Sequence, residues 1–492
     1  MKKYDIGIFG VWSGCNYGSI ATYYALNRVI TSMGKTVLMI DKPVLFEDDV
    51  ELKETHSRRF AREHYDISEQ YRLDEFEKLN DQCDVFIMGS DQVWNYEISK
   101  NFGKRYYLDF VSDDKVKIAY AASFGHSVDF APAEERKKIS ALMKRFDGVS
   151  VREEDGVRIC REDYGVEATR VLDPVFLADR AIFDELAEKS TFREEEPFIA
   201  TYILDPDPEI RKAILYASEK LGGIKVINLL DGLPWTFEEN KNRLDLPNCI
   251  ENLQVEDWLY YIKNAEFVIT DSCHGASFSI IFERNFIAIG NKRRGMSRFR
   301  SLIDLFKLDS HFTVYPEKII NDHAFFDDVD YGLVNTILQS ERKRCYNWLK
   351  SAISANKNRY LDFSVDDDYW EKHCILGNTC LITKYPNSDG GKYAVLKLNE
   401  ILEKDVNYVL SLQFKVMTSS PFLNLHIMKS GTNTIQVIYS HQIDQSNEGK
   451  WNKIEIEFSP DEEGMDSFMV GALQICGENR FLLIKSLNIE KK

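Results

Sequence analysis

The residues that first suggest chemistry lie in the stretch FVITDSCHGASFSIIFERNFIAIG, residues 267–290. Residues 267–270 are typical of a short buried strand and residues 276–282 of an apolar helix, so His274 falls in the joint between them. Such a joint lies at the carboxyl edge of a parallel sheet, where α/β proteins bind ligands. Histidine as a residue type titrates near neutral pH, so in a cleft it can give and take a proton. Asp271 is expected to cap the helix or to orient the imidazole. A histidine that merely packs at the corner is an equal alternative.

A dense basic segment, NKRRGMSRFRSL, follows the next predicted strand. Arginine forks suit the oxygens of phosphate and carboxylate groups. We expect one or two of these cations to bind an anionic substrate and the others to be solvated. The segment places five cations within nine residues: Lys292, Arg293, Arg294, Arg298 and Arg300.

Three more polar segments lie at predicted strand ends. FGVWSGCNYGS brings Asn16 to the start of a helix, but it lacks the GxGxxG dinucleotide fingerprint. Arg152, in SVREEDGVRI, fits either an anion contact or a surface ion pair. MGSDQVWNYE combines a carboxylate, amides and an indole, which suit a sugar. A capped helix start with the indole in the core is an equal alternative. Its candidate residues are Ser90, Asp91, Gln92, Trp94 and Asn95.

Charge and composition exclude several functions. The net charge of -17 disfavours nucleic acid as a partner, because phosphate backbones need a positive surface. The nine cysteines lack CxxC spacing, so neither a disulfide framework nor a zinc site is expected. No apolar run reaches the length of a membrane span, and the start MKKYDIGIFG lacks the apolar core of a signal peptide. We therefore expect a soluble, cytoplasmic protein without an integral membrane segment.

The elements that must position these residues form three domains in the prediction. Strand-like runs alternate with amphipathic helices in residues 1–190 and again in residues 191–365, which indicates two Rossmann-like α/β domains facing a cleft. Residues 366–492 instead show alternating runs broken by turn residues, which is typical of an antiparallel β-sandwich. The aromatic residues Trp370, Tyr385 and Trp451 could give this last domain a sugar-binding platform.

Six motifs together resemble the polysaccharide pyruvyl transferase family. GCNYGS, MGSDQVWN, AYAASFG, SVREEDGV, VLDPVFL and VITDSCHGASFSII occur in the family's order over roughly residues 4–345. The resemblance implies a GT-B-like arrangement of the two α/β domains, with the acceptor on the first and the donor on the second. It also implies transfer of pyruvate from phosphoenolpyruvate to two sugar hydroxyls as a ketal, without metal or cofactor.

The resemblance also assigns roles. His274 is the implied acid or base, with Asp271 as its partner, and Arg152 is an implied contact of phosphoenolpyruvate. Many family members carry an arginine where this chain has Ser272, so a basic residue from the 292–298 segment is expected to replace it. Implied donor-binding residues are Arg152, Ser272, Gly275, Lys292, Arg293, Arg294 and Arg298. Implied acceptor-binding residues are Asn16, Tyr17, Ser90, Asp91, Gln92, Trp94, Asn95 and Ser123.

Two other functions stay open at this point. One is a GT-B-type glycosyltransferase that uses a nucleotide sugar, and the other is a carbohydrate-binding protein without activity, which the serine at position 272 favours. A lipid-linked acceptor would bring the protein to the inner face of the membrane. Oligomeric state, acceptor sugar and linkage are not predicted.

Overall fold

The computed structural model divides the chain into two compact units, Met1–Ala355 and Asn356–Lys492. The residues that it describes are 3–44, 55–354, 370–375, 378–383, 394–416, 422–429, 434–442, 451–473 and 482–491.

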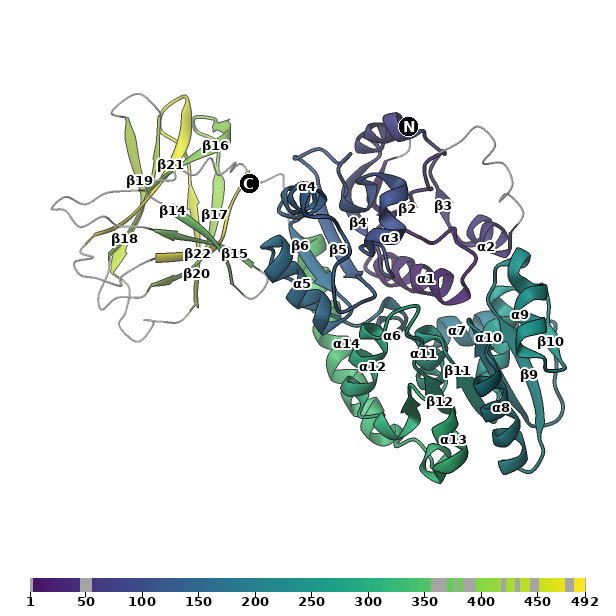
Figure 1. The fold of residues 1–492 in the computed structure, drawn as a ribbon. Coiled ribbons are helices and arrows are strands. Elements are labelled where there is room, and N and C mark those ends of the chain that lie inside the picture. The colour runs from purple at the N-terminus through teal and green to yellow at the C-terminus, as the bar shows by residue number, and fades with distance from the viewer. Residues whose placement is uncertain are drawn as a thin grey trace. The chain divides into compact units, whose positions relative to one another are not determined.

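The first half of the larger unit is built on a seven-stranded parallel sheet of order β3-β2-β1-β4-β5-β6-β7. Strands β2 to β6 of this sheet are labelled in Figure 1. Every residue of β5 is buried, as expected for a parallel strand covered by helices on both faces. The strands are β1 (Tyr4–Phe9), β2 (Val37–Met39), β3 (Asp66–Ile67), β4 (Cys83–Met88), β5 (Val116–Ala122), β6 (Gly148–Val151) and β7 (Thr169–Arg170).

The second half has a six-stranded parallel sheet of order β10-β9-β8-β11-β12-β13. Two parallel-sheet α/β domains are therefore confirmed. The edge strands β10 and β13 have only two residues each, too few to give a sequence pattern. The strands are β8 (Phe198–Ile203), β9 (Lys225–Leu230), β10 (Cys249–Ile250), β11 (Phe267–Thr270), β12 (Asn285–Ile289) and β13 (Phe312–Thr313).

The helices join these two halves through one hydrophobic core. Helix α1 is buried almost all round because α6, α10 and α11 contact it. The helices are α1 (Tyr17–Ser32), α2 (His56–His64), α3 (Tyr96–Ser99), α4 (Ala133–Met143), α5 (Glu154–Tyr164), α6 (Pro174–Leu177), α7 (Ala181–Glu188), α8 (Pro208–Lys220), α9 (Phe237–Leu244), α10 (Val255–Asn264), α11 (Cys273–Ile281), α12 (Ser297–Phe306), α13 (Glu317–Asn321) and α14 (Tyr331–Ile353).

Helix α14 returns to the first half of the unit. It contacts β5 and α6, and its Trp348 ring lies 6.0 Å from that of Tyr120 on β5. The backbone N–H of Leu172 donates to Sγ of Cys345 over 3.2 Å. Helix α14 thus packs on the sheet made by strands of residues 4–170.

The smaller unit contains two antiparallel sheets, of orders β14-β15-β22-β17-β20 and β16-β21-β18-β19. The predicted antiparallel strands are confirmed, and their packing as a sandwich stays a prediction. Tyr385 and the side chains of Trp370 and Trp451 lie outside what the structure describes. The strands are β14 (Trp370–Ile375), β15 (Asn378–Thr383), β16 (Ala394–Leu402), β17 (Tyr408–Val416), β18 (Phe422–Met428), β19 (Ile435–Gln442), β20 (Trp451–Phe458), β21 (Met465–Leu473) and β22 (Leu482–Lys491).

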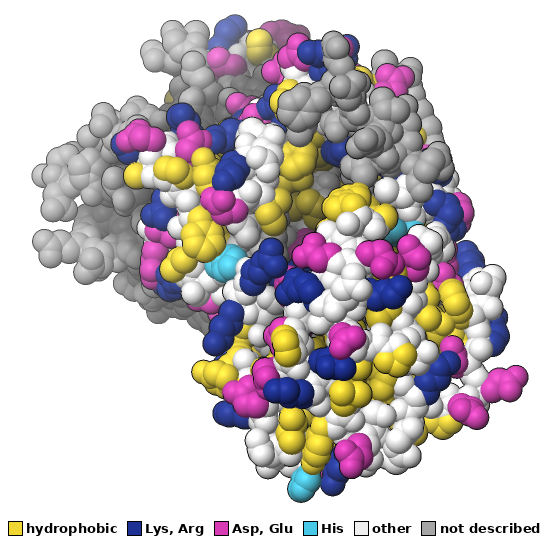
Figure 2. All heavy atoms as spheres, turned by 45° about the vertical axis from the view of Figure 1, so that its right-hand side comes forward, with side chains coloured by type: hydrophobic (Ala, Val, Ile, Leu, Met, Phe, Trp, Pro, Cys, Tyr) yellow, Lys and Arg dark blue, Asp and Glu magenta, His cyan; other side chains and the backbone are white. Residues whose placement is uncertain are grey.

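Acidic and basic side chains are interspersed on the face drawn in Figure 2, which shows no continuous basic stripe. Among the described helices, none is both long enough and apolar enough to cross a membrane.

Candidate active site

The joint after β11 is a capped helix start. Ser272 has extended backbone angles and accepts a hydrogen bond from Gly275 N–H over 3.3 Å, so it caps α11. Helix α11 begins at Cys273, three residues earlier than predicted, and His274 lies in its first turn. A Cβ atom on Gly275 would lie 2.2 Å from Oγ1 of Thr270, so only glycine fits this close approach.

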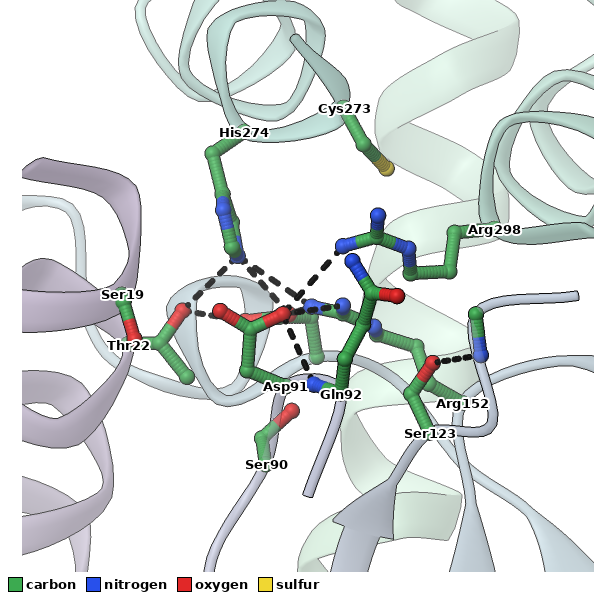
Figure 3. Close-up of polar contacts among 12 residues, drawn as sticks. Ser19, Thr22, Ser90, Asp91, Gln92, Ser123, Arg152, Cys273, His274 and Arg298 are labelled. Atoms are coloured by element: carbon green, nitrogen blue, oxygen red, sulfur yellow. Dashed lines mark hydrogen bonds and ion pairs between the residues drawn. The ribbon is translucent and has the colours of Figure 1, made fainter. Parts of the chain in front are cut away.

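The imidazole of His274 is buried against polar groups from the first half of the unit (Figure 3). Its Nε2 lies 3.1 Å from Oγ1 of Thr22, 3.1 Å from Nη1 of Arg152 and 3.4 Å from Oδ2 of Asp173. Arginine can only donate, so its contact requires an unprotonated Nε2, whereas a protonated ring would donate to Asp173. The ring is therefore placed to take up a proton.

Two arginines from opposite halves converge beside this ring. Arg152, directly after β6, donates to Asp173 and to Oδ1 of Asp91, the latter over 3.2 Å. Arg298, on α12, donates to the same oxygen over 3.2 Å. Both guanidinium groups are buried, and the Nε of each has no hydrogen-bond partner among the described residues. Two buried N–H donors thus lack a hydrogen-bond partner among the described residues.

The carboxylates of this cluster stay ionised. Burial would raise the pKa of Asp173, but Arg152 and His274 outweigh it, so the pKa lies well below its ordinary value. Burial would also raise the pKa of Asp91, but the positive charges of Arg152, His274 and Arg298 outweigh burial, so that pKa is lowered too. Asp91 also has a positive φ of 77°, a strained conformation for a residue other than glycine.

Arg298 differs from the other predicted cations in the residues that it contacts. Arg294 pairs with Asp205 over 2.7 Å and with Asp231 over 3.1 Å. Arg293 is 78% exposed and also pairs with Asp205, and Lys292 lies over the ring of Tyr315. Of the four candidates, Arg298 is the one whose contacts reach the His274 cluster.

The predicted role of Asp271 differs from its observed position. Its carboxylate accepts the backbone N–H of Leu204 over 2.6 Å and of Asp205 over 3.0 Å, together with a side-chain N–H of Asn291 over 3.0 Å. It neither caps α11 nor orients the imidazole, because it fixes the loop that follows β8. Asp173 is the carboxylate beside the ring.

The predicted acceptor residues are spread over several structural roles. Asn16 caps α1, Ser90 donates to Ala121 O over 2.8 Å, and Ser123 donates to Glu153 over 3.0 Å. Asn95 caps α3 and donates to Gln92 over 2.9 Å.

Trp94 and Tyr17 are both buried, with different surroundings. Trp94 is fully buried and donates to Tyr106 O over 3.1 Å, so it is a core residue rather than a sugar platform. Tyr17 lines a cavity. Among the predicted acceptor residues, Asp91 is the one in the His274 cluster.

Sequence reasoning missed Thr22 and Asp173. Asp173 caps α6, with Pro174 in the first helical position, and its Oδ1 accepts from Thr22 over 3.1 Å. An aspartate followed by proline after a strand is a recognisable helix start, but it does not indicate which distant side chain the cap will face. The His274 cluster consists of His274 with Thr22, Asp91, Arg152, Asp173 and Arg298, and four of these six residues lie in the domain that was expected to hold the acceptor.

Comparison with known proteins gives one extensive sequence match. The family model described as Polysaccharide pyruvyl transferase matches residues 16–293. No curated protein matches the chain.

Solved structures give more distant likenesses. UDP-GlcNAc 2-epimerase from Neisseria meningitidis is 10% identical, with a TM-score of 0.45, over 71% of this chain and 100% of the epimerase. A glycosyltransferase from Rickettsia africae ESF-5 is 14% identical, with a TM-score of 0.41, over 72% of this chain and 97% of its own. A CBM4 structure is 9% identical, with a TM-score of 0.21, over 27% of this chain and 94% of its own. Likenesses this distant carry no functional conclusion.

Proposed function

Because the chain belongs to the polysaccharide pyruvyl transferase family, we propose that it transfers pyruvate from phosphoenolpyruvate to two hydroxyls of one sugar. The product is a pyruvate ketal, and phosphate is released. The acceptor is a sugar of a polysaccharide or of its lipid-linked precursor. As proposed, phosphoenolpyruvate is a co-substrate, and neither metal nor cofactor takes part.

One observation carries the proposal: two buried guanidinium groups with unpartnered Nε–H donors lie beside a histidine. Phosphoenolpyruvate has a phosphate and a carboxylate, both of which arginine forks bind well. Arg152 and Arg298 would hold these two anions, and Asp91 neutralises them when no donor is bound. Arg298 thereby supplies the positive charge that Ser272 lacks.

The proposed reaction needs a proton donor and acceptor of near-neutral pKa. Protonation of the donor's methylene carbon makes the neighbouring carbon oxocarbenium-like, and a first sugar hydroxyl attacks it. The C–O bond to phosphate then breaks, and a second hydroxyl closes the ketal. The two sugar hydroxyls release two protons. One of them replaces the proton that the methylene carbon took up to become a methyl group, and the other leaves on the phosphate. His274 is the group placed to shuttle them.

Asp173 acts in this proposal as the positioning residue. Its Oδ2 lies 3.4 Å from Nε2 of His274 and would stabilise the imidazolium formed when the ring takes a proton. Thr22, which lies 3.1 Å from the same nitrogen, would help to fix the ring.

The proposed fold is a GT-B-like arrangement of the two α/β domains. It is supported by the convergence of Arg152, after β6 of one sheet, with His274, after β11 of the other. The proposed location is the cytoplasm, at the inner face of the membrane when the acceptor is lipid-linked.

Calorimetric titration with phosphoenolpyruvate tests the donor site. We expect saturable binding to the wild type and a loss of at least about tenfold in affinity for Arg298→Gln, because a charged hydrogen bond is removed. Arg300→Gln is the matched control, since Arg300 is an exposed arginine of the same helix. Equal affinity in both variants would remove Arg298 from the donor site.

The same titration with UDP separates the rival function. Binding of UDP without any phosphoenolpyruvate signal would favour a nucleotide-sugar glycosyltransferase and contradict the proposal.

His274→Ala should bind phosphoenolpyruvate but release no phosphate when acceptor is added. Asp173→Asn should lower kcat more than it raises KM and should shift the pH profile of kcat, which a purely structural role would not do.

A further inference from the structure

A cavity of about 140 Å³ lies between segments of the two α/β halves. The first half contributes Tyr17 and His56, and the second contributes the loop after β9, which begins at Asp231. The volume is several times the ~30 Å³ of one water molecule. The cavity therefore has room for a small organic group such as a single sugar ring.

Asp231 presents an unsatisfied acceptor at this cavity. Its side chain is only 3% exposed, and its Oδ2 pairs with Arg294 over 3.1 Å. Its Oδ1 is buried and makes no well-aligned hydrogen bond among the described residues, although the nearby backbone N–H of Gly232 lowers the pKa of this carboxylate, which burial raises overall. A buried acceptor left unpaired costs free energy, which a ligand that donates a hydrogen bond would recover.

His56 offers a second acceptor. Its Nε2 lies 2.8 Å from the carbonyl oxygen of Cys15, which can only accept, so Nε2 carries the proton and Nδ1 of the neutral ring is an acceptor. Burial lowers the pKa of His56, which keeps the ring neutral at pH 7. The ring stacks on Tyr17 at a centroid distance of 4.8 Å, and Phe237 adds an apolar wall.

These groups favour a neutral polyol over an anion. Among the described lining residues there are two acids, Asp231 and Glu251, and neither lysine nor arginine. A phosphate-bearing ligand such as a nucleoside diphosphate would meet like charge, and Arg294, the cation beside Asp231, is already paired with that carboxylate. Hydroxyl groups, in contrast, can donate to both the free carboxylate oxygen and the imidazole.

The cavity adjoins the His274 cluster through the first turn of α1. Tyr17 lines the cavity, and the next residue, Gly18, packs so closely on His274 that an added Cβ would lie 2.3 Å from the Cβ of His274. Tyr17 and Gly18 are consecutive residues, so their Cα atoms are about 3.8 Å apart. On the other side, Arg294 pairs with Asp231, and its carbonyl oxygen accepts from Arg298 over 2.9 Å.

We propose that this cavity, lined by Asp231, His56 and Tyr17, holds a neutral sugar ring of the acceptor next to the donor site. The inference rests on the proposed pyruvyl transfer for the identity of the ligand as an acceptor. It assigns acceptor recognition to Asp231 and His56, which the sequence did not predict. It also retains Tyr17, which was among the predicted acceptor-binding residues.

Saturation-transfer NMR of the full chain with four methyl pyranosides, of glucose, galactose, mannose and N-acetylglucosamine, tests the cavity. At least one sugar should bind, and Asp231→Asn should weaken that binding by at least about tenfold. Leu233→Trp, at the half-buried rim, should block the cavity while leaving Asp231 in place. Asp304→Asn, at an exposed position on α12, is the control and should bind like the wild type.

The other outcomes separate the two proposals. Sugar signals of equal strength in the wild type, Asp231→Asn and Leu233→Trp would place any sugar binding elsewhere and overturn the cavity proposal. UDP binding that Leu233→Trp removes would overturn it in favour of a nucleotide. Sugar binding that depends on Asp231 in a protein that does not bind phosphoenolpyruvate would support the cavity and refute only the pyruvyl transfer.

Discussion

At the scale of single residues, the two protonation states of His274 are supported by different neighbours. The neutral ring accepts from Arg152, and the charged ring would donate to Asp173, both at Nε2. Gain of a proton thus exchanges one favourable contact for another. Such a balance suits a group that must transfer protons in both directions in one reaction cycle.

We predict that Asp173→Asn lowers the free energy of unfolding by roughly 3 kcal/mol at pH 7, because it breaks a buried ion pair with Arg152. A carboxylate whose folded pKa is lowered contributes stability above its unfolded pKa of about 3.9 and loses it as the pH falls. The difference between wild type and variant should therefore shrink below about pH 4. Denaturant unfolding at a series of pH values measures it, and a difference that grows in acid would contradict the ion pair.

Asp271 should behave with the opposite sign. Burial raises its pKa to about 6, although the backbone N–H groups of Leu204 and Asp205 oppose the shift. Its contribution to stability is complete below the unfolded pKa of about 3.9 and is lost as the pH rises through about 6. The two carboxylates therefore act in different pH windows.

The sequence singled out His274 and Arg152, and the structure brings these two side chains together. The sequence could not show which of the four cations contacts the His274 cluster, because their partners lie far away in the chain. These cations are Lys292, Arg293, Arg294 and Arg298. The sequence predicts Asp271 as the partner of His274, and it misses Asp173 for the same reason. Proximity in sequence made Asp271 the natural neighbour of His274, whereas strand geometry turns its carboxylate toward the loop after β8.

At the scale of secondary-structure elements, the site is assembled from helix starts. Asn16 caps α1, Asp173 caps α6 and Ser272 caps α11, each through a side chain that accepts a backbone N–H of its own helix. Helix N-termini carry partial positive charge, which favours anions nearby. The long buried strands and the amphipathic helices were predictable from apolar pattern. The two-residue edge strands and the first turn of α11 were not.

We predict that Ser272→Ala destabilises the protein by about 1 kcal/mol through loss of the cap on α11. Its affinity for phosphoenolpyruvate should stay close to that of the wild type, since Arg298 supplies the charge. Thermal unfolding and calorimetry measure the two effects. Ser272→Asp retains a capping side chain and serves as the comparison. A large loss of donor affinity with unchanged stability would instead make Ser272 a donor contact.

We predict that Gly18→Ala abolishes most of the activity. The added Cβ would lie 2.4 Å from Cγ and Nδ1 of His274, so the imidazole or α1 must move. Gly14→Ala is the matched control in the same loop, where the nearest atom, the carbonyl oxygen of Val11, is 3.3 Å away. Steady-state phosphate release measures both. Full activity in Gly18→Ala would show that the ring tolerates displacement.

At the scale of the whole molecule, every described contact of the candidate site and of the cavity lies in Met1–Ala355. One hydrophobic core cluster of this unit includes residues of both α/β halves, so the side chains that each half contributes to the candidate site are held relative to one another. A carbohydrate-binding role for the smaller unit stays a prediction.

We predict that residues 1–355 alone bind phosphoenolpyruvate with the affinity of the full chain. Calorimetry on the truncated protein measures this, with thermal unfolding to establish that it is folded. Loss of acceptor use with donor binding intact would assign the smaller unit to acceptor binding. Loss of donor binding in a folded fragment would contradict the independence of the two units.

The return of α14 to the first sheet has a consequence for synthesis on the ribosome. Trp348 and Ala352 pack near Gly148 on β6, and Trp348 also contacts Tyr120 on β5. Nascent chains fold from the N-terminus as they emerge. All strands of the first sheet have been translated by about residue 170. Its apolar surface on β5 and β6 stays exposed until α14 has been translated as well. The first half of the enzyme is therefore expected to depend on chaperones until nearly all of the larger unit has left the exit tunnel.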